Sequence, residues 1–142
     1  MDRARLNMEQ QILNKYFSKR HGFVGIGSSD AYVDLGLKSN SGKVYRFRIM
    51  LSQFPQAVPK VFLIFPKGIP DKNGNTLSSL GWSHEMHLLT PMDGNPQICH
   101  YKSENWSELV TIYKIGVKLR IWMEAYEGHL RTGRDLDYFV NS

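Results

Sequence analysis

The chain has 142 residues, and its 42% hydrophobic and 22% charged residues are typical of a soluble globular protein rather than a disordered one. This length fits a single domain over residues 1–142 and can bury a substantial hydrophobic core. The longest apolar runs, such as Val61–Phe65, are far too short to cross a bilayer. One cysteine without an export signal predicts a cytoplasmic protein that does not bind membranes.

Eighteen Lys and Arg residues against thirteen Asp and Glu residues give a formal net charge of +5. The basic residues gather only modestly, in the first twenty residues and again after residue 113. We therefore interpret them first as solvated helix faces, second as a surface for an acidic protein partner, and last as a nucleic-acid interface.

The first third of the chain predicts one helix followed by strands. Residues 3–20 place Leu6, Leu13 and Phe17 at helical spacing, and His21-Gly22 is expected to end this helix. Strands are expected over residues 23–26, 32–37 and 44–51, with turns at 27–30 and 39–42 between them. In the third strand Arg46 and Arg48 alternate with apolar residues, which favours a solvent face over a binding site.

Two prolines, Pro55 and Pro59, exclude residues 54–59 from the interior of a sheet, and a fourth strand is expected over 60–65. The order of one helix and then four strands predicts an α+β fold with a four-stranded antiparallel meander that buries one face against helices. Residues 66–98 are rich in Gly and Pro and show no sustained periodicity. We expect them to be irregular, and therefore functional or mobile.

The last third predicts helices. Asn105 and Glu108 resemble a capping box that opens a long helix at Trp106. Its expected core-facing stripe spans Leu109 to Tyr126 at spacings of three or four residues. A second, short helix is expected from Asp135 to Tyr138.

Cys99 is the only cysteine, so it is either an inert buried thiol or a reactive one. Free cysteines are commonly buried, which favours the inert alternative. The preceding Gly94-Asn95-Pro96 and the polar neighbours instead predict a thiol that can be reached from solvent. His84, His87, His100 and Lys102 are the nearby groups that could favour its thiolate.

The segment Phe54-Pro55-Gln56-Ala57-Val58-Pro59-Lys60-Val61 resembles the proline-rich strand junction of ubiquitin-conjugating enzymes. A histidine-bearing loop, the Gly-x-x-x-Ile-Cys segment ending at Cys99, Trp106 and a long helix follow in that family's order. The tail from Trp122 to Gly133 resembles bacterial relatives found in anti-phage defence operons. These carry out cyclic-oligonucleotide-based signalling or ubiquitin-like conjugation.

The resemblance implies a ubiquitin-conjugating-enzyme-like fold with a cysteine loop and C-terminal helices. It also implies a cysteine-dependent acyl transferase in which Cys99 carries the C-terminus of a protein as a thioester and passes it to a lysine amine. His87 and His100 would tune the thiol or deprotonate the amine, and Trp106 would pack the cysteine loop against the helix. No cofactor or metal is implied.

The partners implied are a ubiquitin-like protein or a cGAS-like nucleotidyltransferase as cargo, an acceptor protein, and an activating enzyme. The basic first helix, with Arg5 and Lys15, would dock that enzyme. One departure stands out: the family's His-Pro-Asn triplet is absent, because His87 is followed by Leu88 and Leu89. The oxyanion would then rely on backbone N–H groups near Cys99 or on a histidine.

Three alternatives compete with a transferase. A non-catalytic scaffold of the same fold would bind a ubiquitin-like protein or nucleotidyltransferase, although such variants generally lack the cysteine. A cysteine protease is disfavoured because no recognisable Cys-His-Asn order follows Cys99. A zinc site is disfavoured because His84, His87 and one cysteine do not have zinc-ligand spacing.

Overall fold

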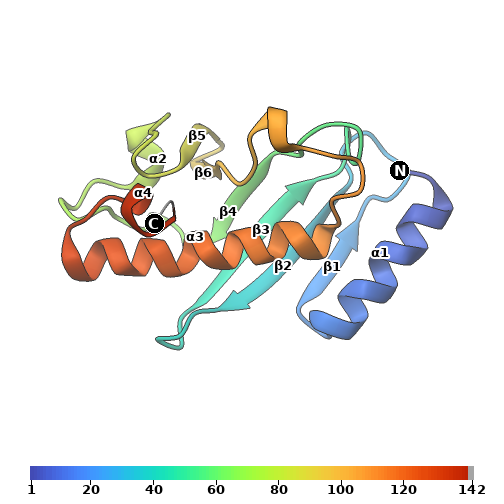
Figure 1. Ribbon diagram of the computed structural model, residues 1–142, viewed down its shortest axis with the longest axis horizontal. Helices are drawn as coiled ribbons and strands as arrows, with labels where there is room; N and C mark the ends of the chain where they lie inside the picture. Colours follow the sequence, from blue (N-terminus) through green and yellow to red (C-terminus); the bar gives the residue numbers. More distant parts are fainter. Residues whose placement is uncertain (141–142) are drawn as a thin grey trace.

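A six-stranded antiparallel sheet with the order β1-β2-β3-β4-β6-β5 forms the centre of the computed structural model, which describes residues 1–140 (Figure 1). Its strands are β1 (His21–Val24), β2 (Tyr32–Lys38), β3 (Val44–Met50), β4 (Val61–Phe65), β5 (Leu88–Met92) and β6 (Asn95–Ile98). The helices of these residues are α1 (Arg3–Tyr16), α2 (Leu77–Leu80), α3 (Ile112–Thr132) and α4 (Leu136–Val140). The expected α+β class is confirmed.

The long helix α3 lies across one face of the sheet, and α1 packs beside it (Figure 1). In β2, Val33, Leu35 and Leu37 are buried on this face, and the residues between them face the other way. Gly116 lets α3 approach closely, because a Cβ there would lie 2.9 Å from the Phe17 ring. The apolar stripe of α3 therefore forms the core with one face of the sheet.

The expected four-strand meander is present as β1 to β4, but the expectation that residues 66–98 are irregular was wrong. Within them β5 and β6 form a hairpin that adds two strands to the sheet. Its turn is Asp93-Gly94, with φ values of 54° and 75°, which are the two left-handed residues of a type I′ turn. This dipeptide is a strong hairpin signal, and Pro91 is tolerated because β5 is an edge strand.

The expected first helix begins at Arg3 as predicted, but its C-terminal end needed correction. The helix ends at Tyr16 rather than at His21-Gly22, and Lys19 adopts the left-handed φ of 63° that was expected of glycine. His21 and Gly22 instead begin β1 and pair with Leu35 and Asp34 of β2. The earlier stop lets the chain turn back into the sheet.

The long C-terminal helix begins six residues later than expected. Asn105 closes a short 3-10 helix (Ser103–Asn105), and Thr111 caps α3 by accepting a hydrogen bond from Lys114 N at 3.1 Å. Leu109, expected in the core, is 86% exposed. The chain between Cys99 and α3 is therefore an irregular connection that contains one short 3-10 helix, instead of the first turns of the long helix. No helix of residues 1–140 has the length and apolarity needed to span a bilayer.

A buried ion pair ties α1 to this connection. The Arg5 guanidinium contacts the Glu9 carboxylate at 2.7 Å and donates to the carbonyl oxygens of Glu108 and Val110. Glu9, fully buried, accepts from Ile112 N at 2.9 Å. Arg5 is thus engaged within the chain, so charge reversal at this residue cannot serve as a test of docking by the first helix.

Substitution Arg5→Ala should lower the free energy of unfolding by about 3–5 kcal/mol, because it leaves the Glu9 carboxylate buried without its partner. Urea denaturation followed by tryptophan fluorescence measures this change. The matched control is Lys15→Ala on the exposed side of α1, which should change stability by less than about 0.5 kcal/mol. Equal effects of the two substitutions would show that the ion pair does not hold the connection.

Candidate functional site

Cys99 lies directly after β6, on the wall of a cavity of about 390 Å³. Its side chain is half-buried, and its N–H donates to the His87 carbonyl oxygen at 2.9 Å. This bond continues the β5–β6 pairing by one residue and fixes the backbone on both sides of the site. The cavity lining also includes His84, His87, His100, Lys102, Asn105 and Lys118, together with the exposed ring of Trp82.

Burial raises the pKa of the Cys99 thiol, and the positive charge of Lys102 opposes this shift without cancelling it. The thiol is therefore mainly protonated at neutral pH. Of the four nearby groups expected to favour the thiolate, only Lys102 lowers the pKa of Cys99. No histidine contributes to the shift. Cys99 is therefore not a preformed thiolate.

His87 presents an imidazole held in place by α4. Its Nε2 lies 2.9 Å from Asp137 Oδ1, and the His87 side chain is 16% exposed. A carboxylate only accepts, so in the neutral ring Nε2 carries the proton and Nδ1 is left as the acceptor. The backbone of His87 has a φ of 52°, an uncommon value for a residue with a side chain. The pair is a candidate proton acceptor beside the thiol.

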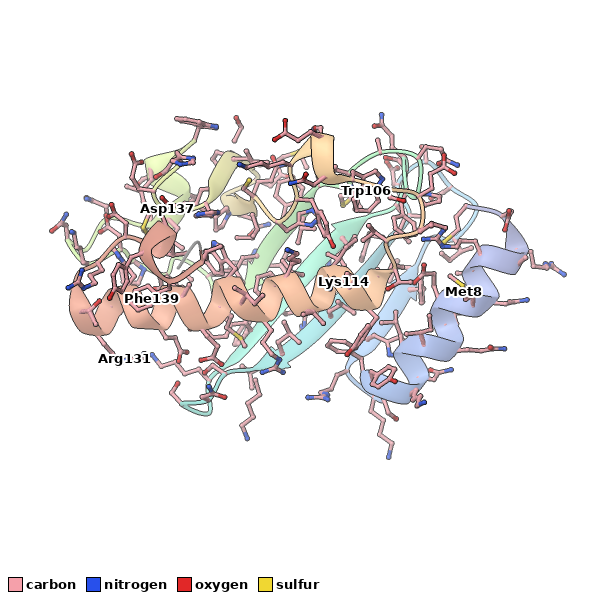
Figure 2. The ribbon with its side chains drawn as sticks, in the orientation of Figure 1. Met8, Trp106, Lys114, Arg131, Asp137 and Phe139 are labelled. Carbon is pink, nitrogen blue, oxygen red and sulfur yellow. The ribbon has the colours of Figure 1, made fainter. Side chains whose placement is uncertain are left out.

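Asp137 was not singled out by the sequence, because fifty residues separate it from His87. It reaches the site through the packing of α4 on α3 (Figure 2). Gly128 of α3 makes this packing possible: a Cβ there would lie 2.9 Å from the Phe139 ring. Asp137 N also donates to the Glu85 carbonyl at 3.2 Å. The sequence predicted the short last helix that carries Asp137, but no functional role for it.

His100 has a different environment from His87. Its Nε2–H donates to the Pro59 carbonyl at 2.8 Å, and within residues 1–140 its buried Nδ1 has no hydrogen-bond partner. Burial lowers the pKa of His100 to about 4, so the ring is neutral at physiological pH. Through the bond to Pro59, His100 anchors the chain after Cys99 to the proline-rich turn, and its expected role in tuning the thiol or deprotonating an amine stays a prediction.

Trp106 provides a second anchor to the same turn. Its indole N–H donates to the Pro55 carbonyl at 2.9 Å, and its ring packs edge-on against Phe54 and Tyr101. In Figure 2, Trp106 lies on the connection that leads into α3, and Asp137 lies near the other end of that helix. Trp106 therefore packs the connection and Tyr101 of the cysteine loop against the turn at Phe54-Pro55, and the packing against the helix expected from the sequence stays a prediction.

Asn105 is a further cavity residue that the sequence analysis assigned to another role. Expected to cap a helix, it instead lines the Cys99 cavity from the end of the 3-10 helix. Its side-chain amide is a neutral hydrogen-bond donor of the kind that stabilises an oxyanion. Among residues 1–140, no group of three or more His, Cys, Asp or Glu side chains is arranged to hold a metal ion.

Comparisons of the chain with protein-family models, with curated proteins and with solved structures gave no match. Support for a function therefore comes from the geometry of the site and from the sequence resemblance.

The pH dependence of Cys99 alkylation follows from its raised pKa. Since the thiolate is the reacting form, iodoacetamide should react with an apparent pKa above the value of about 8.5 found for an exposed cysteine. Lys102→Gln should raise this apparent pKa further and slow alkylation about two- to threefold at pH 8, because it removes the opposing positive charge. Mass spectrometry of the labelled protein measures both.

Lys114→Gln, an exposed residue of α3 outside the cavity, is the matched control and should leave the profile unchanged. An apparent pKa below that of an unstructured cysteine peptide would show that burial does not raise the pKa of this thiol.

Proposed function

We propose that this protein is a bacterial ubiquitin-conjugating-like transferase in which Cys99 carries the C-terminal carboxyl group of a small protein as a thioester. The observation that carries the proposal is the cavity that brings the lone thiol, His87 and Asn105 together, with Asp137 bonded to His87 from α4. The order of first helix, four-strand meander, proline-rich turn and cysteine loop supports it, since the resemblance implied this order.

In the loading step, the Cys99 sulfur attacks the activated carboxyl of the cargo, a thioester on an activating enzyme. The new sulfur–carbon bond forms as the bond to the enzyme's sulfur breaks, and the Cys99 proton leaves with that sulfur. A thioester is exchanged with little change in energy, so a thiol with an ordinary or raised pKa suffices.

In the transfer step, a lysine amine of the acceptor attacks the carbonyl carbon, and the Cys99 sulfur leaves. His87 accepts the amine proton at Nδ1, and the Asp137 carboxylate stabilises the resulting imidazolium through Nε2. Asn105 donates to the oxyanion and takes the place of the asparagine that the missing His-Pro-Asn triplet would have supplied. His100 and Trp106 keep the cysteine loop in position.

The cargo in this proposal is a ubiquitin-like protein or a cGAS-like nucleotidyltransferase, and the setting is anti-phage defence. Docking of an activating enzyme would use exposed basic residues of α1 such as Lys15, because Arg5 is engaged internally. The non-catalytic scaffold remains the competing proposal, and loading of Cys99 separates the two.

A second candidate is suggested by the His87–Asp137 pair, which resembles part of a Cys-His-Asp hydrolase. A hydrolase would pass the acyl group to water instead of an amine. The raised pKa of Cys99 favours the transferase, because the thiol of a Cys–His hydrolase is normally poised as a thiolate. The lifetime of the loaded form in water, with and without free lysine, distinguishes these activities.

Loading is tested by co-expressing the protein with the genes that flank it in its source genome and measuring intact masses. Wild type should form an adduct of protein size that thiols remove, and Cys99→Ala should form none. Cys99→Ser should trap a thiol-resistant oxyester of the same mass. Absence of any adduct, with full biological activity of Cys99→Ala, would reject the transferase and favour the scaffold.

Transfer is tested by mixing the loaded protein with free lysine. His87→Gln should slow discharge about 10²-fold while leaving loading within about twofold, because the base is needed only for the amine. Asp137→Asn should slow it about tenfold, and His84→Gln, whose ring stacks on His87 at 6.0 Å, is the matched control. Equal discharge rates in all four proteins would remove His87 from the mechanism.

Asn105→Ala should slow both steps about 10²-fold, since each passes through an oxyanion. Asn105→Ser, which retains a donor on a shorter side chain, should recover part of the loss. The same loading and discharge assays measure these rates. A normal rate for Asn105→Ala would leave the oxyanion to backbone donors.

A further inference from the structure

A second depression, of about 470 Å³, lies over β1, β2 and β3 and shares no residue with the Cys99 cavity. Four cationic side chains line it, from the turn after α1 and from the two strands of the β2–β3 hairpin: Lys19, Arg20, Lys38 and Arg46. We call this depression the basic groove. In Figure 1 the C-terminal end of α1 and the β2–β3 hairpin both lie along the lower edge of the molecule, and β5 and β6 lie along the upper edge.

The turn that supplies Lys19 and Arg20 is fixed to the sheet. Arg20 N donates to the Phe17 carbonyl at 2.9 Å, and the Arg20 carbonyl accepts from Gly36 N of β2 at 2.7 Å. Phe17 is buried in the core, and Lys19 holds a left-handed φ of 63°. The cations at this side of the groove therefore stand on a rigid backbone, which lowers the entropy cost of binding a ligand.

Glycines leave the floor of the groove bare. Gly36 lies opposite Arg46 in the β2–β3 pairing, and Gly22 occupies the neighbouring strand β1. A Cβ at Gly22 would meet no heavy atom within 4 Å, and one at Gly36 would meet only the Arg20 backbone oxygen and Cβ, at 3.6 and 3.9 Å. Packing does not require either glycine, so the space above them is available to a ligand.

The positive charge of the groove is not neutralised within the chain. Asp34, the acidic residue of the lining, forms an ion pair with Arg48 through two hydrogen bonds of 2.9 and 3.0 Å. In the part of the chain that the structure describes, none of the four groove cations forms a salt bridge. Four like charges around one depression repel one another, and a multivalent anion would relieve that repulsion.

We propose that the basic groove binds a small ligand that carries a chain of two or more phosphate groups. Arg46 offers a planar guanidinium group that can engage two phosphate oxygens, and Lys19 and Lys38 supply point charges beside it. The Arg20 guanidinium lies over the Phe17 ring and donates to the Tyr16 carbonyl at 3.5 Å, so it adds positive charge at the edge of the groove. A carboxylate peptide would satisfy fewer of these donors per unit length than closely spaced phosphates. This site is independent of the chemistry proposed at Cys99.

The test is isothermal titration of the purified full chain with inorganic tripolyphosphate, and in parallel with ATP, without metal. The groove variant Lys38→Gln/Arg46→Gln should bind tripolyphosphate at least tenfold more weakly than wild type. The matched control is Arg3→Gln/Lys114→Gln, which removes the same charge from exposed residues outside the groove and should change binding less than twofold. Tighter binding of ATP would identify a nucleotide; equal binding would identify the phosphate chain alone.

A variant that changes the shape of the groove but not its charge distinguishes specific binding in the groove from nonspecific electrostatic attraction of the anion. Gly36→Val keeps every charge, suits a strand, and fills the floor, so it should also weaken binding about tenfold while urea denaturation shows a folded protein. Equal weakening by the groove and control variants, or normal binding by Gly36→Val, would overturn the proposal. So would tighter binding of a hexaglutamate peptide than of tripolyphosphate.

Discussion

The irregular connection between Cys99 and α3 depends on a small set of hydrogen bonds to parts of the chain far away in sequence. His100 donates to the Pro59 carbonyl and Trp106 to the Pro55 carbonyl, while Arg5 holds the Glu108 and Val110 carbonyls. These three residues replace the regular hydrogen bonds that a helix would have given this segment. Without them the cavity beside Cys99 would lose one wall, because Asn105 and Lys102 belong to the connection.

The remaining walls come from elements that the rest of the fold brings together. The β5–β6 hairpin sets His87 opposite Cys99, and the contact between Gly128 and Phe139 brings α4, with Asp137, to the imidazole. A protonated thiol beside an oriented, carboxylate-supported imidazole suits a reaction in which the base acts on the incoming amine. The proposed transfer chemistry thus depends on tertiary packing as much as on the cysteine itself.

Local patterns predicted the parts of this structure that depend on local interactions. Alternation around Tyr45 and Phe47 predicted the strand, and the helical spacing of Leu119, Trp122 and Tyr126 predicted the buried face of α3.

The start of α3 was predicted wrongly because Asn105 and Thr111 are both acceptable caps, and only the tertiary bonds of Arg5 and Trp106 select the second. Asp137 could not be predicted as a site residue, since its link to His87 spans fifty residues. Asp93-Gly94 is a hairpin signal that the sequence contains, but Pro91 and Pro96 on either side argued against strands there.

The chemical nature of the adduct on Cys99 decides whether this residue carries an acyl group. The adduct isolated from wild type would be divided and treated with neutral hydroxylamine or buffer, then digested so that the peptide containing Cys99 is sequenced by mass spectrometry. If the adduct is a thioester, hydroxylamine should release the cargo with a hydroxamate at its C-terminal residue and return a free Cys99 thiol. An adduct that resists hydroxylamine but yields to a reducing agent is a disulfide, and that result would contradict the account.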